Sequence, residues 1–208
     1  MKIRNFTFAE AVHHLAEENN IMIEPDSNRD ADQWRKSQTE RAELASINRA
    51  AALYYRSILQ SEQGKEAREY LYARDITQDW VDRLGLGLAP AEWSGLADHL
   101  RSQEFDVKKA IALGLLAEKS GGGVYDRFRA RIMFPIVSPH KKEVLGFGGR
   151  IYLEGVAEDD SLRGGAKYIN SPASALFDKS KTFYLINAAM EPVRKHRRVI
   201  LVEGYTDA

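Results

Sequence analysis

The 208-residue chain contains no cysteine. This absence excludes disulfide bonds and any zinc site built on thiolates within these residues. The chain also lacks a run of about eighteen consecutive apolar residues, the length that a membrane-spanning helix requires, and its N-terminus has no apolar signal-peptide core. From these absences we expect a soluble, cytoplasmic protein that has no membrane partner.

An excess of either charge is missing as well, because 30 Lys and Arg balance 30 Asp and Glu. The balance is uneven along the chain. Residues 1–120 hold 16 basic against 20 acidic side chains, whereas residues 121–198 hold 14 against 8. A basic second half on a neutral chain predicts a local anion-binding face. Apolar residues make up 44% of the sequence, which is enough for a sizeable core in one or two domains.

The first half of the chain has the pattern of helices. Residues 6–19 carry a capping-box spacing and an apolar stripe, which predict a short amphipathic helix. Residues 24–37 are polar and rich in turn formers, so we interpret them as a linker. Apolar residues at helical spacing predict a long helix over about 38–60, and Leu84–Pro90 should be extended. Shorter helices are expected at 65–73, 77–84, 94–102 and 106–113.

Beyond Gly121–Gly123 the pattern changes to strands. Ile132–Val137 is apolar throughout and predicts a buried strand, and Val144–Leu153 should return beside it as a hairpin. A helix near 188–196 then precedes the apolar run Val199–Val202, which is typical of a strand buried on both faces. We therefore expect an α+β fold in which a helical N-terminal region packs on a small mixed or antiparallel sheet.

Three arginines at alternate positions, Arg127, Arg129 and Arg131, lead into the first of these strands. If the extended conformation begins at Arg127, all three guanidinium groups share one face. Such a row repels itself unless an anion covers it, and the guanidinium fork matches phosphate oxygens. The alternative is an edge strand that its charges protect from aggregation, which Pro135 also favours.

Other residues suited to phosphate follow the arginines. Gly146, Gly148 and Gly149 stand just before Arg150 and predict a place where the backbone comes close to a ligand. Cationic, amide and aromatic side chains come next, at Lys167, Tyr168, Asn170 and Lys179. Arg74 lies much earlier, and a cation that interacts with the C-terminus of a helix is the simpler interpretation of that residue.

A carboxylate comes directly after the apolar run Val199–Val202 near the C-terminus. Glu203 precedes Gly204, and Asp207 lies four residues further on. Ligands of open α/β sheets gather at the carboxyl ends of strands, where a carboxylate can bind Mg²⁺ or act as an acid or base. The alternative is a solvated glutamate without a ligand. The five histidines share no metal-ligand spacing and are interpreted as surface residues.

Taken together, these segments resemble the bacterial replicative primases of the DnaG type. Four motifs occur in the family's order and spacing: YDRFRARIMFPI from Tyr125, GFGGR from Gly146, KYINSP from Lys167 and VEGYTD from Val202. Four more extend the resemblance over nearly all of the chain: FTFAEAV from Phe6, YLYAR from Tyr70, LGLAP from Leu86 and LFDK from Leu176.

The resemblance implies a polymerase core in which a subdomain with a basic groove precedes a metal-binding TOPRIM domain. The groove would hold template DNA and nucleotide phosphates with eight residues: Arg74, Arg127, Arg129, Arg150, Lys167, Tyr168, Asn170 and Lys179. Glu203 and Asp207 match the acidic positions of the TOPRIM EGxxD stretch, which makes both candidate catalytic residues and Glu203 a partial metal site.

The same resemblance implies the domain boundaries and the partners. Residues 1–37 would be a helix and linker, residues 38–197 the N-terminal subdomain of the core, and residues 198–208 the start of the TOPRIM domain. The family's zinc-binding domain and its later Asp-x-Asp ligands are not in this sequence, so we expect one inactive piece of a longer primase. Its partners would be single-stranded DNA, ribonucleoside triphosphates and, through a domain outside this sequence, the replicative helicase. Its cofactor would be Mg²⁺ or Mn²⁺, with zinc only in the missing domain.

Two other functions stay open at this point. One is a single-stranded nucleic-acid-binding module without catalysis, which the missing acidic pair favours for the chain by itself. The other is a fragment of a different TOPRIM enzyme, such as a topoisomerase or nuclease. The segment from Tyr125 to Pro172 argues against this second alternative.

Overall fold

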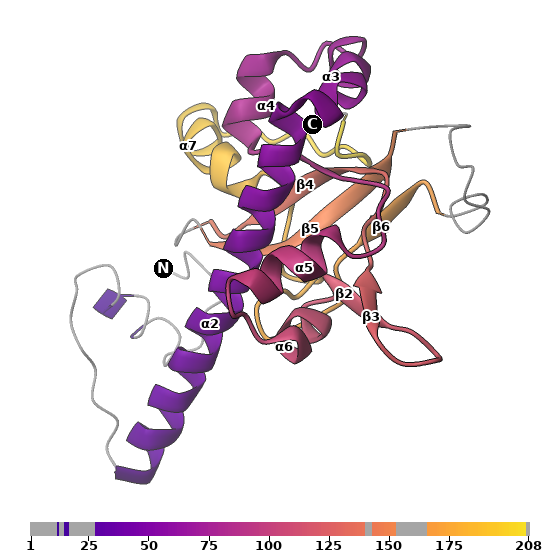
Figure 1. The fold of residues 1–208 in the computed structure, drawn as a ribbon. Coiled ribbons are helices and arrows are strands. Elements are labelled where there is room, and N and C mark those ends of the chain that lie inside the picture. Colours follow the sequence, from indigo (N-terminus) through magenta and orange to yellow (C-terminus); the bar gives the residue numbers. More distant parts are fainter. Residues whose placement is uncertain (1–11, 13–14, 17–27, 140–142, 153–165, 207–208) are drawn as a thin grey trace. The chain divides into compact units, whose positions relative to one another are not determined.

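The structure is a computed structural model that describes residues 12, 15–16, 28–139, 143–152 and 166–206 (Figure 1). The chain divides into two compact units, Met1–Glu40 and Arg41–Ala208. Most of the helix predicted over residues 6–19 lies outside the described residues. In the described part of the chain, no helix combines the length and the apolar character that crossing a membrane would require.

Helix α2, Asn28–Gln60, is longer than the sequence pattern indicated. The linker predicted over residues 24–37 is wrong from Asn28 onward, because that part is helical. The helical part contains neither glycine nor proline, so its residues permit a helix. Its side chains from Arg35 to Ser37 are exposed. The sequence of this part has no apolar stripe, so it gives no periodic signal of a helix.

The remaining helices agree closely with the predicted ranges. They are a 3-10 turn at Glu62–Gly64, α3 at Lys65–Tyr72, α4 at Gln78–Leu84, α5 at Gly95–Ser102, α6 at Val107–Ala112 and α7 at Ile186–His196. Gly64 separates α2 from α3, since a Cβ there would lie 2.1 Å from the carbonyl oxygen of Leu59. Gly85 ends α4 with a φ of 63°, the left-handed conformation common at helix C-termini.

The strands form one four-stranded sheet in the order β1-β4-β5-β6 and one two-stranded sheet, β2-β3. Their bounds are β1 Gly87–Ala89, β2 Leu116–Glu118, β3 Val124–Asp126, β4 Arg131–Val137, β5 Val144–Ile151 and β6 Tyr168–Asn170. All pairings are antiparallel, so the predicted hairpin of β4 and β5 and the α+β class are confirmed. The hairpin of β2 and β3 was not predicted, because three residues are too few to show an alternating pattern.

Strand β4 lies inside the sheet, between β1 and β5. The interpretation of its arginines as protection for an edge strand is therefore wrong. Pro135 is tolerated because β1 pairs only with Arg131–Met133 and ends before the proline is reached. A residue without an N–H group fits where the neighbouring strand has stopped.

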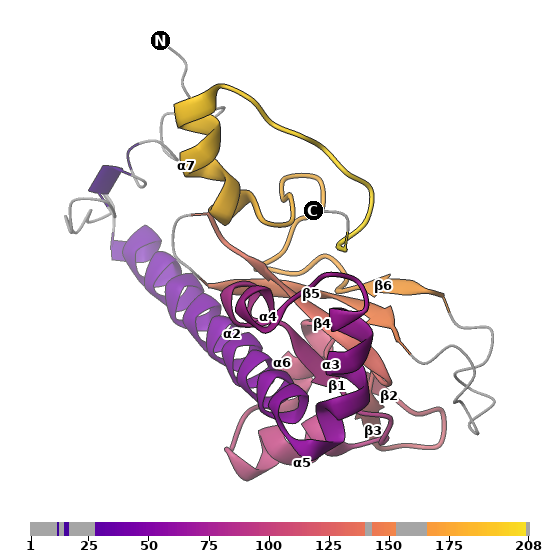
Figure 2. The same cartoon turned by 90° about the horizontal axis from the view of Figure 1, so that it is seen from above.

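Two apolar clusters cover the two faces of this sheet. Met133 and Phe147 belong to the cluster that includes residues of α2, α5 and α6. Ile132 and Phe134 alternate with Met133 along β4 and belong to the cluster that includes residues of α3 and α4. Phe134, predicted to be buried, is 1% exposed. Figure 2 shows α7 on the opposite side of the sheet from the Arg41–Gln60 part of α2.

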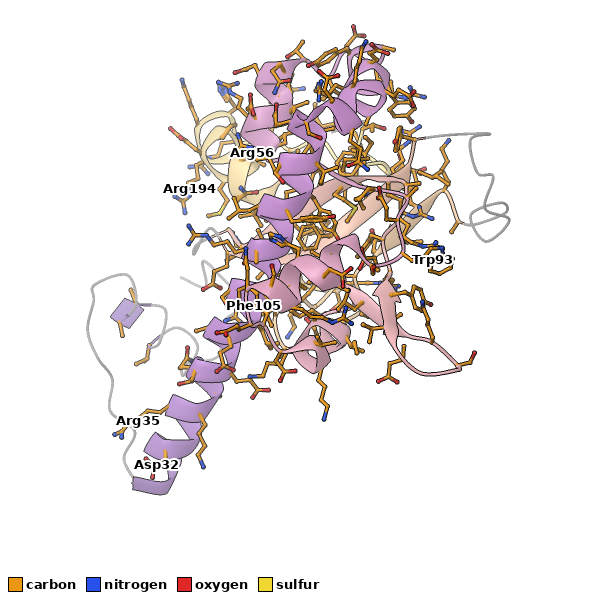
Figure 3. All side chains as sticks on the ribbon, in the orientation of Figure 1. Asp32, Arg35, Arg56, Trp93, Phe105 and Arg194 are labelled. Carbon is orange, nitrogen blue, oxygen red and sulfur yellow. The ribbon has the colours of Figure 1, made fainter. Side chains whose placement is uncertain are left out.

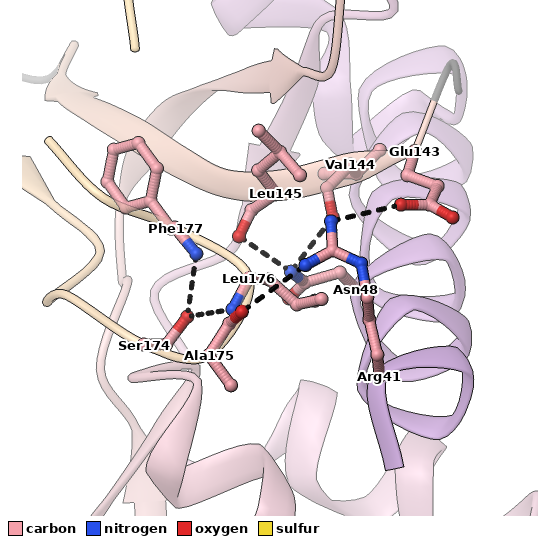
Figure 4. Close-up of polar contacts among 9 residues, drawn as sticks. All are labelled: Arg41, Asn48, Glu143, Val144, Leu145, Ser174, Ala175, Leu176 and Phe177. Atoms are coloured by element: carbon pink, nitrogen blue, oxygen red, sulfur yellow. Dashed lines mark hydrogen bonds and ion pairs between the residues drawn. The ribbon is translucent and has the colours of Figure 1, made fainter. Parts of the chain in front are cut away.

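Polar contacts fix α2 to the start of β5 (Figure 4). The side-chain amide of Asn48 donates to the carbonyl oxygens of Val144 and Leu145, both at 3.0 Å. Arg41 forms an ion pair with Glu143 at 3.4 Å. The pairing of β4 with β5 is irregular where β5 begins, and an irregular register leaves carbonyl groups unpaired. A buried asparagine on α2 supplies the donors for these groups.

The segment Val199–Val202, predicted to be a buried strand, belongs to neither sheet. Its side chains are exposed, from 45% for Val202 to 84% for Ile200. A strand requires a hydrogen-bonded neighbour, and none of the described strands pairs with this segment. The prediction of a strand is therefore wrong for this structure, although the apolar run that prompted it is plain in the sequence.

Candidate nucleic-acid interface

The three arginines before β4 do not share one face of a strand, because β4 begins only at Arg131. Ala130 has a φ of 48°, a left-handed conformation that interrupts the alternation. Arg127 donates to the carbonyl oxygen of Asn170 at 3.0 Å, and Arg131 donates to that of Ala166 at 3.0 Å. The expected row on one face of a strand is wrong, although Arg127 and Arg131 both donate to the segment of residues 166–170. Burial and the charge of Arg127 together lower the pKa of Arg131.

Arg129 belongs to an aromatic and cationic group that we call the Trp93 cluster: Trp93, Lys119, Tyr125 and Arg129. The guanidinium carbon of Arg129 lies 3.3 Å from the centroid of the Trp93 ring, and the Lys119 ammonium lies 5.6 Å from it. The Tyr125 ring meets the indole edge-on, with centroids 5.6 Å apart. Trp93 is 43% exposed and projects outward in Figure 3. Exposed rings beside cations can stack nucleic-acid bases.

A second group, the Tyr70 cluster, consists of Tyr70, Arg74, Arg150 and Tyr168. The guanidinium carbon of Arg74 lies 3.8 Å from the centroid of the Tyr70 ring. That of Arg150 lies 5.6 Å from Tyr70 and 5.4 Å from Tyr168. Two like charges therefore face one ring, and among the described residues no carboxylate forms an ion pair with either arginine. An anion placed here would relieve their repulsion.

Arg150 is the most deeply placed cation of the Tyr70 cluster. It comes from β5 and is only 7% exposed. Its Nη1 donates to the hydroxyl oxygen of Thr206 at 2.9 Å, but its Nε has no hydrogen-bond partner in the described structure. A buried donor without a partner costs about 1–3 kcal/mol. Such a group is expected where a ligand supplies the acceptor.

Strand β6 brings Tyr168 and Asn170 to the same surface. The side-chain oxygen of Asn170 accepts a hydrogen bond from the Tyr205 hydroxyl at 2.7 Å. Lys167 precedes the strand with an exposed side chain, while its carbonyl oxygen accepts from Arg131 at 3.3 Å. Asn170 thus holds a neighbouring segment of the chain, and the ammonium group of Lys167 faces solvent.

Of the predicted site residues, Arg127, Lys167 and Asn170 lie outside both clusters as defined but contact the β6 segment or belong to it, and three others are placed as follows. Lys179 is exposed in the segment after β6, with no hydrogen bond or ion pair to another described residue. Glu203 is exposed too, and Asp207 lies outside the described residues. The described residues contain no group of three His, Asp or Glu side chains that could hold a metal ion. Mg²⁺ needs several oxygen ligands, so Glu203 by itself does not fit a metal centre.

The structure also assigns a supporting role to Asp126, which the sequence did not single out. Its carboxylate accepts from the backbone N–H groups of Leu96 at 2.7 Å and Ala97 at 2.9 Å, and thus caps α5. Its own N–H donates to the carbonyl oxygen of Trp93 at 2.8 Å. Burial raises the pKa of Asp126 to about 6, although the two hydrogen bonds act in the opposite direction. Asp126 therefore fixes the loop that carries Trp93.

Side chains of this chain, and not a ligand, fill the space beside the glycines that precede Arg150. A Cβ at Gly148 would lie 2.3 Å from the Tyr205 ring, and one at Gly149 would lie 2.8 Å from the Phe128 ring. The close approach expected from the sequence is real, but aromatic residues occupy it. Nothing in the order GFGGR distinguishes these two uses of glycine.

The sequence matches the family described as DNA primase catalytic core, N-terminal domain, over residues 54–190. The chain belongs to this family. The DNA primases of Halalkalibacterium halodurans and Clostridium acetobutylicum are 36% and 37% identical to it, over 99% and 100% of this chain. The alignments cover 32% of each relative, so the chain spans about a third of the length of the curated relatives it matches.

Solved primase structures share the fold. One is the RNA polymerase domain of Mycobacterium tuberculosis primase DnaG with a double-stranded DNA oligomer carrying a 6-nucleotide overhang. It is 34% identical with a TM-score of 0.70, over 80% of this chain and 49% of that one. A DnaG primase catalytic domain bound to single-stranded DNA is 29% identical with a TM-score of 0.69, over 82% of this chain and 52% of that one.

Proposed function

We propose that this chain is the part of a DNA primase that holds the single-stranded template and the phosphates of incoming ribonucleoside triphosphates. The observation that carries the proposal is the Tyr70 cluster. Arg74 and Arg150 face the same ring without a carboxylate partner among the described residues, and the Nε of Arg150 lacks an acceptor. Triphosphate oxygens would neutralise both charges and accept a hydrogen bond from the Nε–H group of Arg150.

The two clusters would bind different parts of the ligands. The Tyr70 cluster would bind the phosphates, with Tyr168 as a flat surface for the base or sugar. The Trp93 cluster would stack template bases, while Arg127, Arg129, Lys167 and Lys179 contact the backbone. Binding of this kind tolerates many sequences and weakens strongly with salt. Primase relatives that were solved with DNA support this assignment.

For the complete enzyme we propose the synthesis of RNA primers on single-stranded DNA in the cytoplasm, with the replicative helicase as a partner. Mg²⁺ or Mn²⁺ would be held by Glu203 and Asp207 together with carboxylates outside this sequence, in a TOPRIM domain that begins near residue 198. Because Glu203 is the only predicted metal ligand in the described structure, we expect the 208-residue chain to bind nucleic acid without making primers.

The test is the affinity of the chain for a fluorescent ATP analogue, measured by anisotropy. Arg74→Ala and Arg150→Ala should each weaken binding about tenfold, the effect of one charge-assisted hydrogen bond. Arg83 is a matched control because its guanidinium also faces a ring, that of Trp80 at 5.5 Å, but pairs with Asp79 at 3.4 Å. Arg83→Ala should bind like the unchanged chain. If all three variants bound alike, the Tyr70 cluster would not be a phosphate site.

A further inference from the structure

Residues Tyr205 and Thr206 lie directly on the surface formed by the Tyr70 cluster and β6. Thr206 accepts the hydrogen bond from Arg150 at 2.9 Å, and the Tyr205 hydroxyl donates to Asn170 at 2.7 Å. The rings of Tyr205 and Tyr168 lie 6.0 Å apart. Three of the residues proposed to bind DNA and nucleotide therefore also hold this C-terminal segment.

The Tyr205 ring occupies a space that the sheet leaves open for it. It stacks on Phe134, with centroids 5.1 Å apart and planes 18° apart, and the edge of Tyr184 meets it at 4.8 Å. It also lies over Gly148, where a Cβ would come within 2.3 Å of the ring. Gly148 does not have a left-handed φ. The glycine is therefore needed for the space it leaves and not for its backbone conformation.

The residues just before this contact are not held in the same way. Val199–Val202 pair with no strand among the described residues, and their side chains are exposed. Glu203 lies between this exposed segment and Tyr205, and its own side chain is exposed. In the described structure, the position of Glu203 relative to the sheet is therefore set by the two residues that follow Gly204.

We propose that Tyr205 is a positioning residue that anchors the Glu203 segment beside the Tyr70 cluster and couples it to ligand binding there. The proposal rests on the proposed function, because the coupling requires a ligand on Arg150. A phosphate can accept from the free Nε of Arg150 while Nη1 keeps its bond to Thr206. Binding that orders Arg150 then stabilises the anchor, and by linkage the anchor strengthens binding.

Hydrogen exchange of the 208-residue chain tests the anchor, with peptides over residues 197–206 as the readout. Gly148→Ala inserts a methyl group into the ring's space, and Tyr205→Ala removes the ring. Each should raise exchange of these peptides at least about tenfold, and the double variant should add little, because both remove the same contact. Tyr205→Phe keeps the stacking and should raise exchange about fivefold, the effect of one hydrogen bond.

Gly121→Ala is the matched control, since a Cβ at Gly121 would meet no atom within 4 Å. It should leave exchange over residues 197–206 unchanged. The anchor is refuted if Gly148→Ala also leaves these peptides unchanged. It is refuted equally if Gly148→Ala raises exchange by the same factor throughout β4, β5 and β6, which would indicate a loss of packing and not of an anchor.

A second measurement separates the anchor from the proposed function. Adding ATP to the unchanged chain should slow exchange over residues 197–206 at least about threefold, and Arg74→Ala should reduce this effect by weakening binding. If ATP binds but exchange stays the same, the coupling fails and the phosphate site stands. If ATP does not bind while Gly148→Ala still loosens the segment, the proposed function and the coupling fail, and only the contact remains.

In the full-length enzyme, Gly148→Ala should lower kcat for primer synthesis about tenfold or more with little change in the KM for template, because a displaced Glu203 segment affects the reaction and not template binding. Tyr205→Phe should retain most of kcat, as expected if the ring is the main anchor. Equal losses in Gly148→Ala and in the Gly121→Ala control would overturn the positioning role.

Discussion

The Trp93 cluster and the Tyr70 cluster both place cations against aromatic rings, but they differ in burial. Trp93 is 43% exposed and lies beside the short β2–β3 sheet, whereas Arg150 is 7% exposed and comes from the central hairpin. An exposed ring can accept successive bases of any sequence. A buried guanidinium with a free Nε can accept one anion in one geometry. The difference teaches that, under the proposed function, the exposed cluster would suit a template strand that moves and the buried guanidinium an anion held in one place.

The two clusters also rest on different supports. The Tyr70 cluster lies over the apolar cluster that contains Ile132 and Phe134, which Tyr70 and Tyr205 partly cover. The loop of Trp93 is held by a buried carboxylate, Asp126, through backbone hydrogen bonds. Hydrophobic packing does not depend on pH, but the protonation of a carboxylate does. Changes to the two supports should therefore affect the two clusters separately.

The largest effect is expected from Phe134→Ala, which removes the ring stacked on Tyr205. The side chain is 1% exposed, so the free energy of unfolding should fall by about 3–5 kcal/mol. Urea denaturation measures this change. Phe183→Ala is the control, because Phe183 is 63% exposed and its removal should cost less than about 0.5 kcal/mol. Similar losses for both phenylalanines would contradict the packing described for β4.

The next effect is a pH dependence that arises from Asp126. Burial raises its pKa from 3.8 to about 6, so the folded chain binds this proton at a pH where the unfolded chain has released it. The contribution to stability is therefore fully present below about pH 4 and is lost as pH rises to about 6. The two-unit shift corresponds to at most about 3 kcal/mol.

Unfolding free energies of the unchanged chain and of Asp126→Asn, measured between pH 4 and 7, isolate this contribution. The stability of the unchanged chain relative to the variant should fall as pH rises toward 6 and level off above it. The asparagine keeps one oxygen acceptor for the N-terminus of α5, so the variant should still fold. A difference that is constant across this range would show that the pKa of Asp126 is close to its usual value.

Much of this fold could be predicted from the sequence, because its signals are local. Helical spacing located the helices from α3 to α7, and the apolar run at Ile132–Val137 located β4. The polar start of α2 escaped prediction because its sequence carries no apolar stripe. The strand predicted at Val199–Val202 was wrong for a different reason. The apolar run is visible in the sequence, but whether a neighbouring strand pairs with it depends on the tertiary structure.

The residue types of the candidate site could be predicted from the sequence, but their arrangement in space could not. The alternating arginines predicted one strand face, but β4 begins only at Arg131 and Ala130 before it has a positive φ, so the three do not lie along one strand. The glycines before Arg150 indicated a close approach, and only the fold reveals that Tyr205 makes it at Gly148. Trp93 gave no signal, since one aromatic residue in a loop has no pattern. Its contact with Arg129, which lies far along the chain, appears only in the fold.

A smaller effect than the stability changes is expected for Trp93→Ala on the affinity for single-stranded DNA. Stacking of one base contributes about 1–3 kcal/mol, so the dissociation constant should rise about tenfold. Binding of the ATP analogue should not change, because the Tyr70 cluster does not include this ring. Trp80→Ala is the matched control: Trp80 is 47% exposed and also carries an arginine, Arg83, at 5.5 Å. Equal losses from both variants would remove the distinction between Trp93 and any exposed tryptophan.

The smallest effect is expected from Arg129→Ala. The guanidinium lies over Trp93 at 3.3 Å, so its loss removes one positive charge from the Trp93 cluster but leaves the ring. Affinity for single-stranded DNA should fall about fivefold at low salt, and the slope of log K against log salt should decrease by about 0.7, the value for one phosphate contact on a single strand. Arg194→Ala removes the same charge from α7, on the side of Figure 3 away from Trp93, and should leave the slope unchanged.

An unchanged slope for Arg129→Ala, with the affinity nonetheless reduced, would mean that Arg129 orients the indole and does not contact phosphate. A slope that fell equally in both variants would indicate attraction by net charge, and the Trp93 cluster would then have no special place in template binding.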